Sequence, residues 1–225
     1  MATTPRKDDQ ERELAHQRAL MVERHIAARG IKDERVLQAM RDVPRHRFVP
    51  QVVAAKAYGA GALPIGAKQT ISQPYIVAAM TEALIEGLDK KLTRVLEIGT
   101  GCGYQTAVLA PFVQHVYSVE RIAALQQRAR TILAELRITN VSLRHADGWH
   151  GWRSQAPFQG MLVAAAPEVV PHELCEQLDD GGRLVIPIGE RGRQMLLRVT
   201  RQGNELKREQ LLPVSFVPFV EGTES

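Results

Sequence analysis

The chain has 225 residues, 44% of them hydrophobic and 24% charged, which fits one globular domain that can bury a core. Its 29 basic and 25 acidic residues are mixed along the chain and give a net charge of +4, and only 5% are aromatic, so we expect no nucleic-acid partner. There are two cysteines, Cys102 and Cys175, and no N-terminal apolar stretch for a signal peptide or membrane span. We therefore expect a cytoplasmic protein with neither a disulfide framework nor a membrane partner.

The first part of the chain predicts helices and one long loop. Residues 1–10 are polar and are expected to be frayed, and residues 11–29 predict an amphipathic helix that ends at Gly30. A second, short helix begins after Asp33 as its N-cap and ends before the prolines of "VPRHRFVP". Residues 51–68 are rich in Gly and Ala without a clean period, which predicts a surface loop with some short structure. The stretch "QTISQPYIVAAMTEAL" then predicts a helix with an apolar face behind a polar shoulder.

The rest of the chain alternates short apolar runs with amphipathic segments. Strands are predicted at "TRVLEIG", "HVYSVE", "NVSLRHAD", "GMLVAAA" and "GGRLVIPIG", and helices at "YQTAVLAPF", "IAALQQRARTILAEL" and "PHELCEQL". This alternation predicts a Rossmann-like, doubly wound α/β fold with a mostly parallel sheet. Two antiparallel strands around a Gly-Asn turn, and a last strand at "VSFVPFV", are expected at the C-terminal end.

A glycine-rich loop follows the first of these strands in "VLEIGTGCGY", where the strand ends in Glu97. Its residues are Gly99, Thr100, Gly101 and Gly103. Glycines at alternate positions let the backbone approach a ligand, although a plain strand-to-helix turn is the simpler alternative. A dinucleotide site would place the third glycine one residue later, and Glu97 would repel a phosphate. The acid suits a cationic ligand such as S-adenosylmethionine, which carries a sulfonium and an ammonium group.

Polar residues also end the next two predicted strands. Glu120, followed by Arg121, is placed to accept the hydroxyls of a ribose, and Asp147 with Gly148 to read an adenine edge. Each has an ordinary alternative, a solvated strand-end acid or an Asp-Gly turn. Because three successive strand ends meet in one crevice of a doubly wound sheet, we expect all of them to belong to the cofactor site.

Several of these segments together resemble one family. "VLEIGTGCGYQTAVLA", "VYSVER", "ADG" and especially "LPIGAKQTISQPYIVAAMTE" are similar to protein-L-isoaspartate O-methyltransferases, class I S-adenosylmethionine-dependent enzymes that repair damaged proteins. "RVLQAM", "VPRHRFVP", "HELCEQL" and "GGRLVIPIG" extend the resemblance to residues 22–220. The glycine motif is shared by many methyltransferases, whereas "QTISQP" is much more specific.

The resemblance implies methyl transfer from S-adenosylmethionine to the α-carboxylate of L-isoaspartyl residues, with S-adenosyl-L-homocysteine as the product and no metal. It implies that Ser72 is catalytic, that Thr70, Ile71 and Ser72 hold the carboxylate, and that Gln69 and Thr70 also contact the cofactor. Because a carboxylate is already a nucleophile at neutral pH, we expect Ser72 to donate a hydrogen bond rather than to form a covalent bond. Its simpler role is to cap the helix that follows.

The resemblance also implies two regions with different roles within one structural unit. We expect residues 1–90 to form the helical N-terminal extension and the substrate-covering loop, and residues 91–225 to form the Rossmann-like core. Isoaspartyl peptides and proteins are the expected partners. A monomer is expected, because nothing in the sequence marks an unusually apolar exposed face.

Four positions depart from the family's pattern, and one of them is Cys102, where the family commonly has Ser. Ala60 stands where Asp is usual, Lys68 where Gly commonly precedes Gln, and Gln159 where the fourth strand normally begins with Asp. These three departures leave a second hypothesis open, a carboxylate methyltransferase that acts on a dedicated peptide. A third is a nucleotide-binding protein without transferase activity, or a nicotinamide-dependent oxidoreductase.

Overall fold

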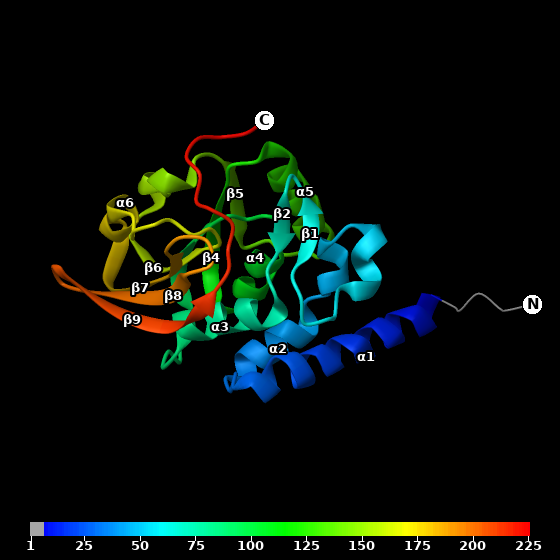
Figure 1. The fold of residues 1–225 in the computed structure, drawn as a ribbon. Helices are drawn as coiled ribbons and strands as arrows, with labels where there is room; N and C mark the ends of the chain where they lie inside the picture. The colour runs from blue at the N-terminus through cyan, green and yellow to red at the C-terminus, as the bar shows by residue number, and fades with distance from the viewer. Residues whose placement is uncertain (1–6) are drawn as a thin grey trace, which may run out of the picture.

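The computed structural model describes residues 7–225, and in this part of the chain a seven-stranded sheet forms the centre of the molecule (Figure 1). Its strands are β3 (Leu92–Ile98), β4 (Val113–Glu120), β5 (Val141–His145), β6 (Phe158–Val163), β7 (Leu178–Ile188), β8 (Gln194–Gln202) and β9 (Glu205–Val214). The order is β5-β4-β3-β6-β7-β8-β9, parallel from β5 to β7 and antiparallel from β7 to β9. The predicted Rossmann-like fold is therefore confirmed, as is the hairpin around Gly203 and Asn204.

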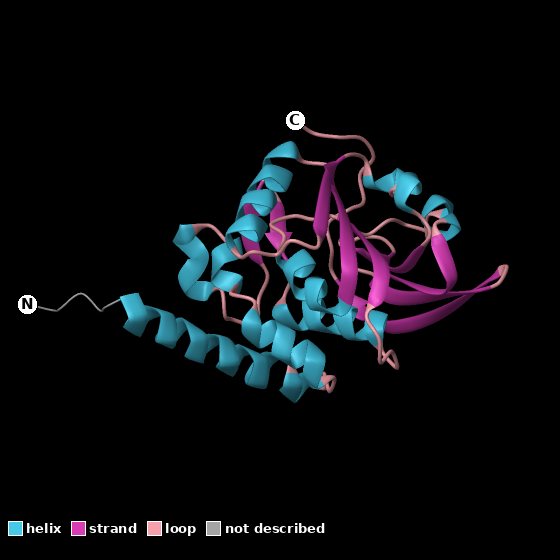
Figure 2. Ribbon diagram, turned by 180° about the vertical axis from the view of Figure 1, so that it is seen from behind, coloured by secondary structure: helices cyan, strands magenta, loops and turns pink. Residues whose placement is uncertain are grey.

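Helices cover both faces of the sheet (Figure 2). They are α1 (Lys7–His25), α2 (Glu34–Asp42), α3 (Pro74–Ile85), α4 (Tyr104–Leu109), α5 (Ala123–Glu135) and α6 (His172–Glu176). Shorter 3₁₀ helices span Ala27–Arg29, Arg45–Phe48, Gln51–Lys56, Ala110–Phe112, Gly148–His150 and Arg153–Gln155. None of the helices within residues 7–225 is long and apolar enough to cross a membrane.

Two apolar clusters form the core, one on each face of the sheet. Because successive side chains of a strand point to opposite faces, Val95 joins the cluster under α3, α4 and α5, while Leu96 joins the cluster under α6. In β6, Leu162 joins the first of these clusters and its neighbour Val163 joins the second. Burial on both faces explains why these strands appear in the sequence as continuous apolar runs.

The N-terminal helices share the first of these clusters with the sheet. Buried side chains of α1, α2 and α3 belong to it, and α1 runs along the outer side of α2 (Figures 1 and 2). Helix α1 begins at Lys7, earlier than predicted, and the expected left-handed Gly30 has φ +103°. Asp33 caps α2 as predicted, accepting a hydrogen bond of 2.9 Å from the Arg35 N–H. The first six residues of the expected frayed start lie outside the described part.

Two local predictions differ from the structure. Residues 51–68 contain more regular structure than expected: the 3₁₀ helix comes first, and β1 (Leu63–Gly66) then pairs with β2 (Gln69–Ile71) in a hairpin whose Pro and Gly residues hide the alternation of a strand. In the segment "VSFVPFV", Val214 is the last residue of β9, and the residues after it form one isolated bridge, Ala166 to Pro218, in place of the predicted strand. Pro218 has no N–H to donate, which stops a longer ladder.

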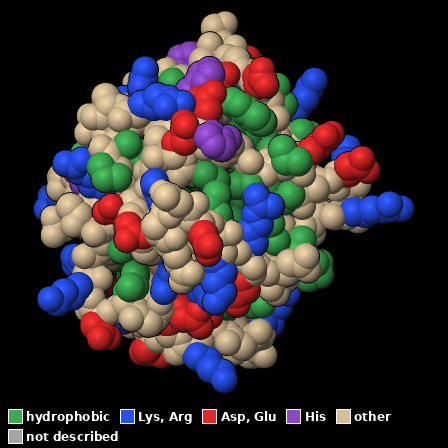
Figure 3. Space-filling model, turned by 90° about the vertical axis from the view of Figure 1, so that its left-hand side faces the viewer, with side chains coloured by type: hydrophobic (Ala, Val, Ile, Leu, Met, Phe, Trp, Pro, Cys, Tyr) green, Lys and Arg blue, Asp and Glu red, His purple; other side chains and the backbone are tan. Residues whose placement is uncertain are grey.

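The surface mixes charges of both signs. The face in Figure 3 carries acidic and basic side chains next to one another, with small apolar areas between them. The even distribution of charge along the sequence thus persists on this face of the folded chain.

Candidate functional site

A cavity lies at the carboxyl ends of β3, β4 and β6. The strand order reverses at this place, because β4 and β5 lie on one side of β3 while β6 and β7 lie on the other. Four parts of the chain contribute to it: the β1–β2 hairpin with Ser72 directly after it, the loop after β3, the end of β4 and the C-terminal tail. Its lining comes from residues within 65–77, 98–105, 119–122 and 217–220, together with Gly148, Ala164 and Ala165. The predicted residues Gln69, Thr70, Ile71, Ser72, Gly99, Thr100, Gly101, Glu120, Arg121 and Gly148 all line this cavity.

The glycine loop brings backbone to the cavity wall. Gly99 and Gly101 have φ of +91° and +54°, a left-handed conformation that favours glycine. A Cβ at Gly101 would lie 3.4 Å from Ile65 of the hairpin, so the loop and the hairpin meet closely. Gly103, with φ +89°, begins α4 and does not line the cavity, and its own Cβ would meet Ala129 of α5 at 3.2 Å. Gly103 is therefore placed for helix packing.

Glu120 ends β4 inside the cavity, with 5% of its surface exposed. Its Oε2 accepts a hydrogen bond of 2.8 Å from the Gly101 N–H, and its Oε1 accepts one of 2.9 Å from the Ile122 N–H. Because each carboxylate oxygen has more than one lone pair, both can still accept a hydroxyl. Arg121 lines the same wall, and its side chain forms an ion pair of 3.0 Å with Glu224.

Glu97 lies beneath the glycine loop and does not line the cavity. It is completely buried, and both Thr106 Oγ1 and Ser118 Oγ donate hydrogen bonds of 2.5 Å to its Oε2. Burial raises the pKa of Glu97 to about 7. Since Ser118 gives its only proton to Glu97, the 2.6 Å contact between Ser118 and Thr100 has Thr100 as donor. Glu97 is thus connected to the cavity through two hydroxyls.

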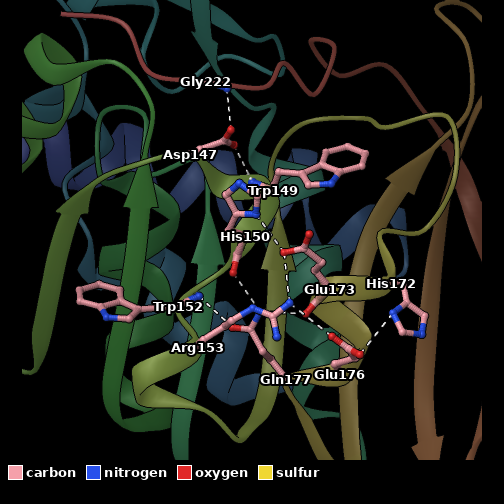
Figure 4. Close-up of polar contacts among 10 residues, drawn as sticks. All are labelled: Asp147, Trp149, His150, Trp152, Arg153, His172, Glu173, Glu176, Gln177 and Gly222. Carbon is pink, nitrogen blue, oxygen red and sulfur yellow. Dashed lines mark hydrogen bonds and ion pairs between the residues drawn. The ribbon is translucent and has the colours of Figure 1, made fainter.

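Asp147 supports the cavity from behind (Figure 4). Its Oδ1 accepts a hydrogen bond of 2.8 Å from the Trp149 N–H, and its Oδ2 accepts one of 2.6 Å from the Gly222 N–H. Neighbouring Gly148 lies in the wall, where a Cβ would come within 2.4 Å of Ile98 Cγ2, so only glycine fits. Asp147 therefore fixes a turn and the tail, and it does not line the cavity.

A polar cluster on the far side of Asp147 holds the same turn against α6 (Figure 4). Gln177 accepts a hydrogen bond of 2.9 Å from the Trp152 N–H and donates one of 3.0 Å to the carbonyl of His150. His150 Nδ1 lies 2.9 Å from Glu173, which raises the pKa of the exposed imidazole. These contacts fix the turn that places Gly148 in the cavity wall.

The C-terminal tail closes one side of the cavity, a role that the sequence analysis missed. Residues 217–220 line it, and Phe219 packs on Trp149 with 5.2 Å between ring centroids. Beyond them, the Glu224 N–H donates a hydrogen bond of 2.7 Å to the carbonyl of Arg121. The tail, red in Figure 1, is thus fastened at the end of β4. Nothing in the apolar pattern of "VSFVPFV" distinguishes such a strap from a strand.

Ser72 lies between β2 and α3, and it does not cap the helix. The N-cap of α3 is Gln73, which makes no side-chain capping bond, and within the described residues the half-buried Ser72 hydroxyl has no hydrogen-bond partner. The capping interpretation is therefore wrong. The hydroxyl is free to donate to a ligand.

Arg45 holds the backbone of Ser72 from below, a second contribution that the sequence analysis missed. Its Nη2 donates a hydrogen bond of 2.8 Å to the Ser72 carbonyl, and its Nε donates one of 2.9 Å to the Ala57 carbonyl. The side chain is completely buried, burial lowers its pKa, and its Nη1 has no partner among the described residues. The only signal in the sequence is an arginine inside "VPRHRFVP".

Of the four departures from the family's pattern, Cys102 lines the cavity, whereas Ala60, Lys68 and Gln159 lie outside its wall. Lys68 is exposed at the turn of the hairpin, and Ala60 is exposed before it. Gln159 is at the start of β6, where its side chain accepts a hydrogen bond of 2.5 Å from the Thr93 N–H. At that position Gln159 ties two strands together, so this departure changes a sheet contact and leaves the cavity lining unaltered.

A second groove adjoins the cavity, and the two share Thr70, Ser72, Ala164 and Val217. Its other wall is formed by residues 212–216, at the end of β9. Thr70 and Ser72 therefore stand at the junction of two compartments. A ligand in the cavity and a second one in the groove would meet at these side chains.

The cavity fits a ligand with the character of S-adenosylmethionine. Glu120 offers a carboxylate to hydroxyls, and Gly148 leaves room that a side chain would fill. Within the described residues, no group of three or more His, Cys, Asp or Glu side chains is arranged to hold a metal ion.

Comparisons with known proteins agree with this site. The family model described as protein-L-isoaspartate(D-aspartate) O-methyltransferase matches residues 16–224. A protein-L-isoaspartate O-methyltransferase of Aliivibrio fischeri is 51% identical over 212 residues, which are 93% of this chain and 99% of the relative. One of Halorhodospira halophila is 54% identical over 198 residues, 88% of this chain and 89% of the relative.

Solved structures give the same assignment. A Plasmodium falciparum chain described as a protein-L-isoaspartate O-methyltransferase in complex with S-adenosyl-L-homocysteine superposes with a TM-score of 0.78 at 25% identity. The match covers 90% of this chain and 98% of that one. Since the family model and these relatives span nearly the whole sequence, the chain belongs to the protein-L-isoaspartate(D-aspartate) O-methyltransferase family of S-adenosylmethionine-dependent methyltransferases.

Proposed function

We propose that this chain methylates the α-carboxylate of L-isoaspartyl residues in damaged proteins. The observation that carries the proposal is the position of Thr70 and Ser72, which line both the cavity and the adjoining groove. A cofactor in the cavity and a peptide in the groove would place a methyl donor and a carboxylate on either side of these two residues. The family membership of the chain supports the same reaction.

The cavity residues are proposed to hold the cofactor. Gln69, Thr70, Gly99, Thr100, Gly101, Glu120, Arg121 and Gly148 line it. Glu120 would accept the ribose hydroxyls, and the glycines would admit the ligand close to the backbone. Glu97, Gly103 and Asp147 would act from behind, by fixing the loops that carry the lining. When bound, S-adenosylmethionine supplies an electrophilic methyl group, and S-adenosyl-L-homocysteine is the product.

In the groove, Ser72 is proposed to orient the substrate. Its free hydroxyl would donate a hydrogen bond to one oxygen of the carboxylate, leaving the other oxygen as the nucleophile. Thr70 and buried Ile71 would shape the same cradle and keep water from the reacting atoms. The carboxylate is already ionised at neutral pH, so the proposed step uses neither a general base nor a metal. The ester formed then collapses to a succinimide without further help from the enzyme.

A pair of peptides tests the proposal. Labelled S-adenosylmethionine is supplied with one isoaspartyl peptide and one peptide of the same sequence with normal aspartate. We expect base-labile label on the isoaspartyl peptide alone. Label on the normal peptide alone would support the second hypothesis, a carboxylate methyltransferase for a dedicated peptide.

Three further measurements test the cofactor, the absence of a metal and the oligomeric state. Calorimetry is expected to show binding of S-adenosylmethionine, whereas binding of a nicotinamide dinucleotide in its place would overturn the cofactor assignment. A chelator is expected to leave methylation unchanged, because no metal takes part in the proposed step. Sedimentation is expected to show a monomer.

A further inference from the structure

Arg29 places a cation in the groove that adjoins the cavity. It ends the 3₁₀ helix Ala27–Arg29 and lines the groove together with Thr70, Ser72 and Gln73. Its guanidinium carbon lies 3.7 Å from the centroid of the Tyr75 ring, in the first turn of α3. A guanidinium packed on an aromatic ring is held in place while its N–H donors stay available to a ligand. Arg29 is therefore positioned close to the residues proposed to hold the substrate carboxylate.

The carboxylates that share a surface depression with Arg29 are bound to other partners. Glu82, Glu86 and Glu209 line a neighbouring depression together with Arg29. Glu82 accepts hydrogen bonds of 2.8 Å from two backbone N–H groups, while Glu86 and Glu209 both form ion pairs with Arg198. Among the described residues, none of the ion pairs within 4.0 Å involves the Arg29 guanidinium. The cation at the groove is thus left without an internal counter-charge.

We propose that Arg29 selects substrates that carry a second carboxylate near the isoaspartyl residue. The guanidinium would bind this carboxylate through two parallel N–H donors, the geometry that arginine favours. The carboxylate can belong to an Asp or Glu side chain or to the free C-terminus of a fragment. This inference rests on the proposed function, because it assumes that the peptide occupies this groove.

The length of a peptide limits where the second carboxylate can be. An extended chain advances by about 3.3 Å per residue, so neighbours within roughly three positions of the isoaspartyl residue stay close to a groove shared by Arg29 and Ser72. Because the complex would form at a solvent-accessible rim, the added affinity is modest and sensitive to salt. It should appear mainly in KM, since Arg29 touches neither the methyl donor cavity nor the reacting atoms.

A peptide series tests the inference. One isoaspartyl parent peptide carries Gln at each neighbouring position in turn, and matched peptides carry Glu or Lys there. A further pair differs only in having a free or an amidated C-terminus, which separates the two sources of carboxylate. The wild-type enzyme is expected to favour Glu over Gln at one position, or the free C-terminus over the amide, by about two- to fivefold in kcat/KM.

Variants assign that preference to the guanidinium. Arg29→Ala is expected to bring the ratio between the two peptides to about one, and Arg29→Glu to reverse it in favour of Lys. Arg29→Lys keeps the charge and is expected to keep part of the preference. Arg24→Ala is the matched control, because exposed Arg24 lies on α1 and lines neither groove nor cavity, and its ratio should equal that of the wild type.

Equal kcat/KM for the Glu, Gln and C-terminal peptides would overturn the inference, as would an unchanged ratio in Arg29→Ala. Ratios are compared within one enzyme, so a partly unfolded variant still gives a valid result. If the parent isoaspartyl peptide is not methylated at all, the proposed function has failed instead. The two failures are therefore distinguishable.

Discussion

Arg45 and Ser72 are joined by a hydrogen bond of 2.8 Å from the guanidinium Nη2 to the Ser72 carbonyl oxygen. The bond links residues that are 27 positions apart, and the donor is completely buried. A buried guanidinium whose N–H groups donate to carbonyl oxygens fixes those carbonyls firmly, because a buried donor or acceptor without a partner lowers the free energy of unfolding. The backbone of the proposed catalytic residue is thus held by a cation in the helical N-terminal region.

Arg45→Lys is expected to lower the free energy of unfolding by about 2 kcal/mol, because a compact ammonium group cannot reach both the Ala57 and the Ser72 carbonyl. We also expect kcat/KM to fall under conditions in which the variant is folded. Urea denaturation and steady-state kinetics measure the two effects. Arg47→Lys is the matched control, since Arg47 pairs with Glu135 at the surface and should change stability little. Equal behaviour of the two variants would contradict the role of Arg45.

Ser72→Ala separates ligand binding from helix capping. Because the Ser72 hydroxyl caps nothing, the free energy of unfolding should stay within about 0.5 kcal/mol of the wild-type value. Loss of a hydrogen bond to a charged carboxylate should lower kcat/KM roughly 10- to 100-fold. Ser72→Thr, which keeps the hydroxyl, should retain more activity. Lower stability with unchanged turnover would restore the capping interpretation.

Glu97→Gln should remove a pH dependence of stability. Burial raises the pKa of Glu97 to about 7 in the folded chain, from the 4.5 of an exposed glutamate. Between these values the unfolded state releases the proton while the folded state keeps it, so the stability that protonated Glu97 contributes is lost as pH rises. The loss is on the order of 3 kcal/mol and is complete above the folded pKa.

Gln has no proton to release, so the difference in unfolding free energy between Glu97→Gln and the wild type should grow in favour of the variant from pH 4.5 to above 7. Urea denaturation at several pH values measures it, and other titrating groups cancel in the difference. Two parallel curves would show that Glu97 ionises as readily in the folded chain as in the unfolded one.

Lys68→Gly should stabilise the hairpin. Ala67 and Lys68 have φ of +47° and +56°, and a side chain in this region costs about 1 kcal/mol relative to glycine. The free energy of unfolding is therefore expected to rise by up to about 1 kcal/mol. Lys68→Ala, which removes the charge and keeps the strain, should give no such gain. If both variants were stabilised equally, the charge of Lys68, and not its backbone conformation, would be responsible.

Local chemistry determines most of the secondary structure of this chain. The apolar runs of β3, β4 and β6, the Asp33 cap and the left-handed Gly30 follow from periodicity and from the conformational limits of single residues. The glycine loop and Glu120 were also placed correctly at strand ends, because a doubly wound sheet brings the ends of parallel strands to one edge. An apolar pattern with a period of two residues predicts a strand, and one with a period of 3.6 residues predicts a helix.

Tertiary structure alone decided which side chains reach the cavity. Glu97 lies next to the last residue of β3 and Asp147 two residues after β5, yet packing turns both away from the wall, Glu97 toward two hydroxyls and Asp147 toward the tail. The Arg45 anchor and the strap at residues 217–220 come from segments far from the glycine loop in sequence, and no local period records such contacts. The sequence by itself determined the sheet and the family motifs, whereas the enclosure of the site depends on long-range contacts that form only when the whole chain is folded.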